Sequence, residues 1–367
     1  MTDPSTIPAP TAADSDERLV RIGVLGSGFV ADFYLDGLRD VARARAVANY
    51  SRSAERAADF GRRRAIGRQY TDMAELCADP DVDMVVVALP NHLHVEAVRT
   101  AAGAGKAIVC TKPLARNAQE AAEIVRIVRE AGVMHGYAET EVFSPDVMKA
   151  REMIESGAIG DVLSVRAREA HSGPHAEHFW NAEQAGGGAL LDMGCHTVEV
   201  ARYFFGKDVP VTHAFAWGAT LTHGDKTTAE DNAVAMLKFA NGGISITEAS
   251  WSAKGGMELR NEVMGTEGRL ITDSTNTSVW GFIGKPAGYL MEKADADTGF
   301  VYPIPDEARH YGYHEELRHF VECFLTGAKP RETFADGYVV NVILDACYRS
   351  MQTGRWEPIE LDPEVTG

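Results

Sequence analysis

Three polar residues have types and positions that suit proton chemistry. Asp192 and His196 are four residues apart on a run at 189–205 that predicts one helix ending at Gly206. Residues with this spacing share a helix face, so Asp192 can orient His196, order a substrate or favour the charged imidazole. Lys112 lies just after the carboxyl end of an apolar run at 107–110 that predicts a buried strand. Histidine exchanges protons near neutral pH and lysine stabilises negative charge, which indicates proton transfer at a hydroxyl group.

The elements that must position these residues alternate in the first part of the chain. Strands are predicted at 19–25, 46–50, 83–89 and 107–110, and helices at about 29–40, 54–63, 94–103 and 118–131. This alternation predicts a doubly wound parallel sheet with helices on both faces. Because such sheets bind ligands at the carboxyl ends of their strands, Lys112 should lie at the ligand-binding edge.

The pattern changes after about residue 137. Longer strands of alternating character are predicted at 163–167, 212–217, 233–239, 244–251, 258–264 and 269–272, and two closing helices at 315–325 and 338–351. Turns at 241–243 and 265–268 favour hairpins. The second part is therefore predicted to be an α+β domain on a large, open, mostly antiparallel sheet. The predicted organisation is a disordered tail at 1–18, a first domain at 19–138 and a second at 139–367.

A glycine-rich turn joins the first predicted strand to the first helix. It has Gly26 at its tight corner, Gly28 where a pyrophosphate must approach the backbone, and Ala31 where the helix packs on the strand. The amino end of the helix then offers amide donors to phosphates. The strand, the turn and the helix agree, so residues 19–138 are predicted to bind a dinucleotide.

The end of the second strand favours NADP over NAD. An acidic residue there would bind the ribose 2′-hydroxyl, but the chain has Ser51 and Arg52, which suit a 2′-phosphate. The alternative is that Arg52 stacks on the adenine or faces water and that NAD is bound through other contacts. The cofactor is thus predicted to be NADP or NAD, with NADP favoured.

Three motifs resemble the glucose–fructose oxidoreductase and inositol dehydrogenase (Gfo/Idh/MocA) family. They are the Pro-Asn-x-x-His segment at 90–94, the Lys-Pro signature at 112–113, and the Gly-Gly-Gly to His segment at 186–196. The resemblance covers nearly the whole chain, to Gly354 and Arg355. It implies a Rossmann domain followed by an α/β domain whose open sheet often forms a subunit interface, and hence a homodimer or homotetramer.

One position departs from the family pattern. The glutamate that precedes the signature lysine is Thr111 in this chain. The lysine and the proline remain, so the ammonium group of Lys112 is expected to be kept. How it is held is left open, because a neighbouring carboxylate would favour the charged form.

The resemblance and the residues together predict a nicotinamide-dependent oxidoreductase acting on a secondary alcohol of a sugar, glycoside or inositol. Lys112, His196 and Asp192 are the predicted catalytic residues. His196 is expected to exchange the proton and Lys112 to stabilise the oxygen, although these two roles can be exchanged. The predicted cofactor-binding residues are Gly26, Gly28, Phe29, Val30, Ser51, Arg52, Leu89, Asn91, His94 and Lys112.

A histidine-rich segment at 171–180 is predicted to be a substrate loop. His175 would bind hydroxyl groups, and Trp180 would offer an apolar face to a sugar ring. Glu139, in the segment that joins the two domains, and the pair Asp192 and His196 complete the predicted substrate-binding set. Three histidines and Glu177 also allow a metal site, but the irregular segment does not fix ligand geometry and no metal is predicted.

Composition excludes several other classes of protein. A formal charge of −17 argues against electrostatic binding of nucleic acid or of an anionic membrane. Five scattered cysteines without a CxxC pair indicate a reduced compartment, and no apolar run reaches the roughly 18–20 residues of a membrane helix, so a cytoplasmic protein is predicted. Two alternatives stay open: a dinucleotide-binding regulator without catalysis, and a lyase or glycosidase that uses nicotinamide transiently without net redox change.

Overall fold

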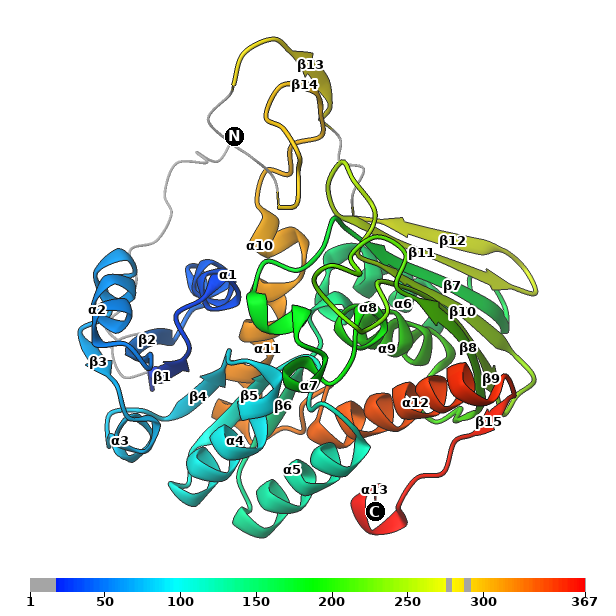
Figure 1. The fold of residues 1–367 in the computed structure, drawn as a ribbon. Coiled ribbons are helices and arrows are strands. Elements are labelled where there is room, and N and C mark those ends of the chain that lie inside the picture. The colour runs from blue at the N-terminus through cyan, green and yellow to red at the C-terminus, as the bar shows by residue number, and fades with distance from the viewer. Residues whose placement is uncertain (1–17, 275–278, 287–291, 367) are drawn as a thin grey trace, which may run out of the picture.

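Two sheets lie side by side in the computed structural model, which describes residues 18–274, 279–286 and 292–366 (Figure 1). Apart from Arg18, the predicted tail at 1–18 lies outside the described residues. None of the helices in the described ranges is long and apolar enough to cross a membrane.

The first sheet is parallel and has six strands in the order β3-β2-β1-β4-β5-β6. Its strands are β1 (Val20–Leu25), β2 (Ala44–Tyr50), β3 (Arg68–Tyr70), β4 (Met84–Val87), β5 (Ala107–Thr111) and β6 (His135–Ala138). The central strands β4 and β5 are buried along their whole length, as parallel strands covered on both faces must be. This confirms the predicted doubly wound sheet.

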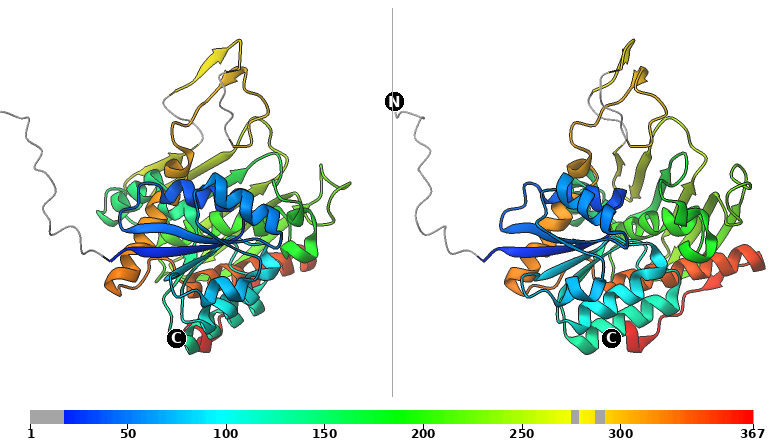
Figure 2. Two further views of the ribbon diagram at one scale, coloured as in Figure 1. Left: turned by 90° about the vertical axis from the view of Figure 1, so that its left-hand side faces the viewer. Right: turned by 60° about the vertical axis from the view of Figure 1, so that its left-hand side comes forward.

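Helices cover both faces of the parallel sheet, with α1 and α2 above it and α4 and α5 below it in Figure 2. The helices of this part are α1 (Phe29–Leu38), α2 (Ala54–Arg63), α3 (Met73–Ala78), α4 (His94–Gly103) and α5 (Ala118–Ala131). Helix α5 has its predicted bounds because Asn117 accepts a hydrogen bond from the Glu120 amide and Gly132 ends the helix with φ +64°. Strand β3 and helix α3 were not predicted, since both are short.

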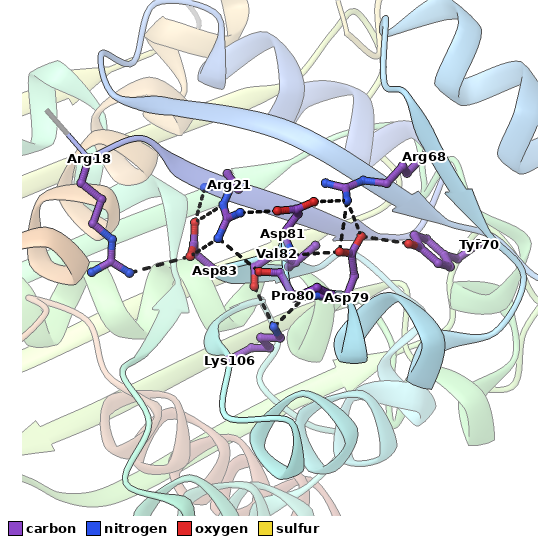
Figure 3. A network of polar contacts seen from close by, with 10 residues as sticks. All are labelled: Arg18, Arg21, Arg68, Tyr70, Asp79, Pro80, Asp81, Val82, Asp83 and Lys106. Atoms are coloured by element: carbon purple, nitrogen blue, oxygen red, sulfur yellow. Dashed lines mark hydrogen bonds and ion pairs between the residues drawn. The ribbon is translucent and has the colours of Figure 1, made fainter. Parts of the chain in front are cut away.

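A network of charged side chains joins the amino ends of the parallel strands (Figure 3). We call it the amino-edge network, and its members are Arg18, Arg21, Arg68, Tyr70, Asp79, Asp81, Asp83 and Lys106. Arg21 pairs with Asp83 at 2.9 Å and with Asp81 at 2.6 Å. Lys106, just before β5, donates to the carbonyl oxygens of Asp79 and Val82. Cations and anions alternate here, which holds neighbouring strand ends together.

The second sheet has seven strands in the order β12-β11-β7-β10-β9-β8-β15, and only the pairing of β7 with β10 is parallel. Its strands are β7 (Val162–Ala170), β8 (Val211–Ala219), β9 (Asn232–Phe239), β10 (Ile244–Ser250), β11 (Glu258–Gly265), β12 (Arg269–Asp273) and β15 (Glu357–Pro358). The predicted turn between β9 and β10 is present, with Gly242 at φ +89°. The mostly antiparallel sheet is therefore confirmed.

One face of the second sheet is packed and the other is open. Helices α9 and α12 lie along the packed face (Figure 1). The side chains of Trp217, Met264 and Ile271 alternate with buried residues of their strands, lie on the other face and are each about half exposed. The remaining helices are α6 (Pro145–Glu155), α7 (Ala182–Ala185), α8 (Ala189–Asp192), α9 (Gly194–Phe205), α10 (Glu307–His310), α11 (Tyr313–Thr326), α12 (Phe334–Thr353) and α13 (Pro363–Thr366). Helix α6 and the small hairpin of β13 (Gly281–Ile283) and β14 (Gly299–Val301) were not predicted.

Candidate active site

The turn after β1 has the shape that a pyrophosphate group requires. Gly26 has φ +128°, and a Cβ there would lie 2.2 Å from the Ala88 carbonyl oxygen, so only glycine fits. A Cβ on Gly28 would have no atom within 4 Å, which leaves open space beside the backbone. Gly28 also has no side chain to occupy the first-turn amides of α1, and Phe29 and Val30 are partly exposed at this end. The residues present therefore fit a dinucleotide.

Ser51 and Arg52 lie directly beside this turn. The Gly26 amide donates to the Tyr50 carbonyl oxygen at the end of β2, which brings the two loops together. The Ser27 hydroxyl donates to Ser51 Oγ over 3.0 Å, and Arg52 is exposed next to it. The structure thus brings these two residues to the edge where the predicted ribose contact would be made.

Leu89, Asn91 and His94 hold the loops on both sides of Lys112. His94 is fully buried, and its ring nitrogens contact the carbonyl oxygens of Leu89 at 2.9 Å and Leu114 at 3.0 Å. Asn91 Nδ2 donates to the Ala185 carbonyl oxygen over 2.8 Å. Both polar side chains are therefore hydrogen-bonded to backbone carbonyl oxygens, and they support the loops that form the cofactor edge.

Lys112 follows β5 at the carboxyl edge of the parallel sheet, and its peptide bond to Pro113 is cis. Its Nζ donates to the Asp192 carbonyl oxygen over 2.7 Å and to Asp192 Oδ1 over 3.1 Å. Burial lowers the pKa of Lys112, but the negative charge of Asp192 outweighs it and raises the pKa above its usual value. Asp192 therefore supplies the carboxylate that Thr111 lacks, and the ammonium group stays charged.

Asp192 is held from two sides. Trp251 Nε1 donates to its Oδ2 over 3.0 Å, opposite the bond from Lys112. Burial would raise the pKa of Asp192, but the charge of Lys112 and these hydrogen bonds leave it below the usual value. Asp192 is thus a buried, ionised partner of Lys112.

The prediction of one helix over 189–205 is wrong. The helix is interrupted at Met193, between α8 and α9. The reason is the Asp192 carbonyl group: it accepts from Lys112, whereas the His196 amide donates to the Met193 carbonyl oxygen instead. The interruption directs Asp192 toward Lys112 and Trp251, and the hydrogen bond to the His196 ring is made by another carboxylate.

That carboxylate is Glu139, at the end of β6. Its side chain is fully buried, and its Oε1 is hydrogen-bonded to His196 Nδ1. On the other side of the ring, His196 Nε2 lies 3.9 Å from Glu169 Oε2 on β7. Glu139 thus fixes the ring through Nδ1 and leaves Nε2 directed toward the space that Glu169 borders.

Three buried glutamates surround His196, and we call Glu139, Glu141 and Glu169 the carboxylate cluster. Asn261 Nδ2 donates to Glu141 Oε1 over 2.8 Å. Burial, reinforced by the charge of Glu169, raises the pKa of Glu141 to about 8. The Oε2 atoms of all three glutamates are buried and have no hydrogen-bond partner in the described chain. The cluster therefore holds more carboxyl groups than the protein's own cations neutralise.

The predicted substrate loop lies against the glycine turn. The His175 ring is 4.3 Å from the Phe29 ring, and its Nε2 is 3.6 Å from Glu292 Oε1. Trp180 packs at 5.3 Å from Trp251, the residue that binds Asp192. A cavity of about 550 Å³ is lined by residues of both parts, among them Phe29, His175, Trp180, Glu292 and Lys293. The structure thus brings the loop to an opening beside the cofactor edge.

The histidines of this loop do not converge on one point. His171 Nδ1 accepts from the Gly173 amide, His175 lies on Phe29, and the His178 ring lies on Phe179. Within the described ranges, the groups with metal-like donor spacing do not include these histidines; two of them contain His196. The metal alternative for 171–180 therefore gains no geometric support.

Sequence reasoning missed Glu141, Glu169 and Trp251. Glu169 and Trp251 lie at the ends of β7 and β10, which are distant from each other in sequence but are neighbours in the sheet. The predicted strand at 163–167 stopped before Glu169. The signal available was the alternation of β7, which continues to Ala170 and directs Glu169 to the packed face.

Comparison with known proteins assigns both parts of the chain. Residues 20–139 match the oxidoreductase family with an NAD-binding Rossmann fold, and residues 147–271 match the GFO/IDH/MocA C-terminal domain. The chain is 32% identical to 1,5-anhydro-D-fructose reductase of Ensifer adhaerens, over 93% of this chain and 98% of that protein. It is 29% identical to levoglucosan dehydrogenase of Pseudarthrobacter phenanthrenivorans, over 92% and 97%.

A solved structure extends this likeness to three dimensions. GenD2 from gentamicin A biosynthesis, in complex with NAD, has a TM-score of 0.88 and 28% identity, over 97% of this chain and all of that one. The glycine turn, the lysine and the histidine lie on the same two domains that the family matches cover. The chain belongs to the Gfo/Idh/MocA family of oxidoreductases.

Proposed function

We propose that this protein transfers a hydride between a nicotinamide cofactor and a secondary alcohol carbon of a sugar, glycoside or inositol. The observation that supports this most is the arrangement at the carboxyl edge of the parallel sheet. There Lys112 is held by Asp192, and His196 is held by Glu139, which leaves His196 Nε2 available. The named relatives act on carbohydrate-derived substrates, which favours the same class for this chain.

The residues divide the work of oxidation between them. His196 Nε2 accepts the hydroxyl proton, and the positive charge that forms on the ring is stabilised by Glu139 through Nδ1. Lys112 donates a hydrogen bond to the same substrate oxygen while the carbon–oxygen single bond becomes a carbonyl bond. The nicotinamide ring, when bound, supplies the acceptor for the hydride and, in the reverse direction, the donor. In reduction His196 returns the proton.

Lys112 is better suited to charge stabilisation than to proton transfer. Its partner Asp192 raises the pKa of Lys112 above the usual value, so the ammonium group keeps its proton at working pH. His196 contacts the buried carboxylate Glu139 through Nδ1, and its Nε2 is directed toward the substrate space. We therefore favour His196 as the group that exchanges the proton and Lys112 as the group that stabilises the oxygen.

The proposed cofactor site consists of the glycine turn, Ser51 and Arg52, with Leu89 at the edge of β4. We favour NADP because the exposed guanidinium of Arg52 and the Ser51 hydroxyl suit a 2′-phosphate. NAD is the alternative, and GenD2 was solved with it. The ratio of kcat/KM for NADP to that for NAD decides between them, and a ratio below one contradicts the NADP preference. Arg52→Ala should lower that ratio.

The proposed substrate contacts come from the second domain and its loop. Asp192, beside Lys112, would accept a hydrogen bond from a neighbouring hydroxyl, and His175 at the cavity would bind a more distant one. Trp180 lines the same cavity and would pack against the ring. Glu139, which was also predicted to bind substrate, would act indirectly by orienting the His196 ring. His175→Ala should raise KM more than it lowers kcat, because His175 is remote from the reacting oxygen.

We further propose a homodimer or homotetramer formed through the open face of the second sheet. Trp217, Met264 and Ile271 are half exposed on this face, and such apolar side chains mark subunit contacts. The boundary between the domains at 138 and 139 stays a prediction. Light scattering measures the mass, and Trp217→Asp should weaken the assembly. A monomeric wild-type protein at working concentration contradicts the proposal.

Cytoplasmic location and the absence of nucleic-acid binding remain predictions. All five cysteines are free and buried, which suits a reducing compartment. Fractionation of the native host tests the location, and a shift assay with labelled DNA and RNA tests the binding.

The central test is nicotinamide reduction with NAD or NADP and a panel of monosaccharides, glycosides and inositols. We expect absorbance of the reduced cofactor with at least one substrate group, and its loss in Lys112→Met and His196→Ala. Lys106→Met is the matched control, because Lys106 lies at the opposite end of β5 and bonds only backbone carbonyl oxygens. Product formation without net cofactor reduction would support the lyase alternative, and cofactor binding without any turnover would support the regulator.

A further inference from the structure

Glu169 is a buried carboxyl group directed into the reaction space. It lies near the end of β7 on the packed face of the second sheet, with 5% of its surface exposed. Its Oε2 is 3.9 Å from His196 Nε2 and has no hydrogen-bond partner in the described chain. His196 Nε2 is the atom that meets the substrate hydroxyl in the proposed function. A group on Glu169 Oε2 would therefore lie next to the reacting oxygen.

The charges around Glu169 do not balance. Lys112 is already bonded to Asp192, and the His196 ring to Glu139. Lys293, whose charge also acts on this region, donates to the Gly173 carbonyl oxygen over 2.6 Å. No lysine or arginine of the described chain forms an ion pair with Glu141 or Glu169 within 4 Å. Two carboxyl groups of this space, Glu141 and Glu169, therefore lack a lysine or arginine partner in the described chain.

The pKa of Glu169 reflects the same excess of carboxyl groups. Burial, with the charges of Asp192, Glu139 and Glu292, raises the pKa of Glu169 well above its usual value, although Lys112 opposes this. A buried carboxyl group in this state either keeps a proton or gains a cation from a ligand. Glu292, whose charge acts on Glu169, also lines the 550 Å³ cavity. The lining of this cavity carries the carboxylates Glu292, Asp295 and Glu307 together with Lys226 and Lys293.

We propose that Glu169 is a specificity-determining residue that binds a protonated amine on the carbon next to the oxidised one, so that the preferred substrates are amino sugars or aminocyclitols. The proposal rests on the proposed hydride transfer and specifies its substrate class. The ammonium group donates to Glu169 Oε2 while the adjacent hydroxyl donates to His196 Nε2. A neutral hydroxyl in place of the amine would form a hydrogen bond with Glu169 but would bring no positive charge to the Glu169 carboxylate.

The test uses pairs of substrates that differ only in this group. D-glucosamine is compared with D-glucose, and an aminodeoxy-scyllo-inositol with scyllo-inositol, by kcat/KM with saturating cofactor. We expect the amine to be preferred by about tenfold or more in at least one pair, the effect of one charge-assisted hydrogen bond. Glu169→Gln should abolish this preference while retaining turnover of the neutral partner. Glu177→Gln is the control: it removes an exposed carboxylate from the 171–180 loop that follows β7, and it should keep the preference for the amine.

Three results would overturn the proposal. First, a kcat/KM for the neutral partner that equals or exceeds that for the amine in both pairs contradicts the amine site. Equal losses for amine and neutral substrate in Glu169→Gln would make Glu169 a general positioning residue. Loss of turnover of both after EDTA treatment, restored by a divalent cation, would assign Glu141, Glu169 and His196 to a metal, since their donor atoms lie within 4.8 Å of one another.

Failure of the hydride-transfer proposal gives a different result. In that case no substrate of either kind reduces the cofactor. Calorimetric titration of the amine into the protein with NADH then still tests Glu169, because the expected affinity depends on the ammonium contact and is lost in Glu169→Gln. Amine binding that is the same in wild type and Glu169→Gln would overturn the proposal independently of turnover.

Discussion

The two ends of the parallel sheet handle charge in opposite ways. In the amino-edge network, aspartates and arginines alternate at the partly exposed strand ends, and Lys106 bonds two backbone carbonyl oxygens (Figure 3). At the carboxyl edge, Lys112 is bonded to Asp192 and the carboxylate cluster has no lysine or arginine partner in the described chain. The two lysines flank the same strand, β5. Their surroundings, rather than their type, distinguish them.

This difference indicates a structural role for the amino edge and a ligand-binding role for the carboxyl edge. Exposed ion pairs are screened by water and contribute little to stability, so the amino-edge network serves to match strand ends. Buried carboxyl groups without partners destabilise a fold unless a ligand compensates them. Buried, unpaired carboxyl groups at the ligand-binding edge of the sheet therefore indicate a role in ligand binding or catalysis. Substitutions at the two edges should therefore differ sharply in their effects.

The largest effect is expected from Lys112→Met. Removal of the ammonium group takes away the stabilisation of the developing oxyanion, and kcat should fall by about 10²- to 10³-fold. Steady-state kinetics on the substrate found in the panel measure this. Lys106→Met, at the other end of β5, should leave kcat near the wild-type value.

The comparison fails if both lysine variants lose activity to the same extent. Lys112→Met also leaves Asp192 buried without its cation, so folding must be checked by circular dichroism. Lys112→Arg keeps the charge but changes the donor position, and it should recover folding more than activity.

A smaller effect is expected from Glu139→Gln. The amide keeps a hydrogen bond to His196 Nδ1 but no longer stabilises the charged ring, so kcat should fall by roughly 10- to 100-fold. Steady-state kinetics on the substrate found in the panel measure this change. An unchanged kcat in a folded Glu139→Gln protein would indicate that Glu139 only supports the fold.

Glu141 should make stability depend on pH. An unfolded glutamate ionises near 4.5, whereas burial and Glu169 raise the pKa of Glu141 to about 8 in the folded protein. Between these values the folded state binds more protons than the unfolded state, so this contribution to stability is lost as the pH rises from about 4.5 to about 8. Glu169, Glu139 and His196 all face this group, and their charges act on it.

Glu141→Gln removes that dependence because the amide does not titrate. The Tm of the variant relative to wild type should be more favourable at pH 8 than at pH 5, by about 2 °C or more. Scanning calorimetry at both values measures it, and Asn261 can still donate to the amide oxygen. An unchanged difference between the two pH values would show that Glu141 ionises normally.

The sequence predicted the residues that a local pattern defines. Gly26 and Gly28 lie in one turn, and Lys112 follows one apolar strand, so neighbouring residues were sufficient. The pairing of Lys112 with Asp192 was not predictable, because the two residues are 80 positions apart in the chain and meet only in the tertiary fold. Glu169 and Trp251 likewise reach the site only through the pairing of β7 with β10. The break at Met193 depends on the contact between Lys112 and the Asp192 carbonyl group, which no local periodicity encodes.

The smallest effect is expected from Asp81→Asn in the amino-edge network. Asp81 is 56% exposed and accepts from Arg21 and Arg68, so water already screens most of its charge. We expect a fall in Tm of less than about 2 °C, which shrinks further in high salt. Kinetic constants should not change, since the whole sheet separates Asp81 from Lys112. A loss of activity in this variant would mean that the two edges are coupled through the strands, and the contrast between them would then be one of degree.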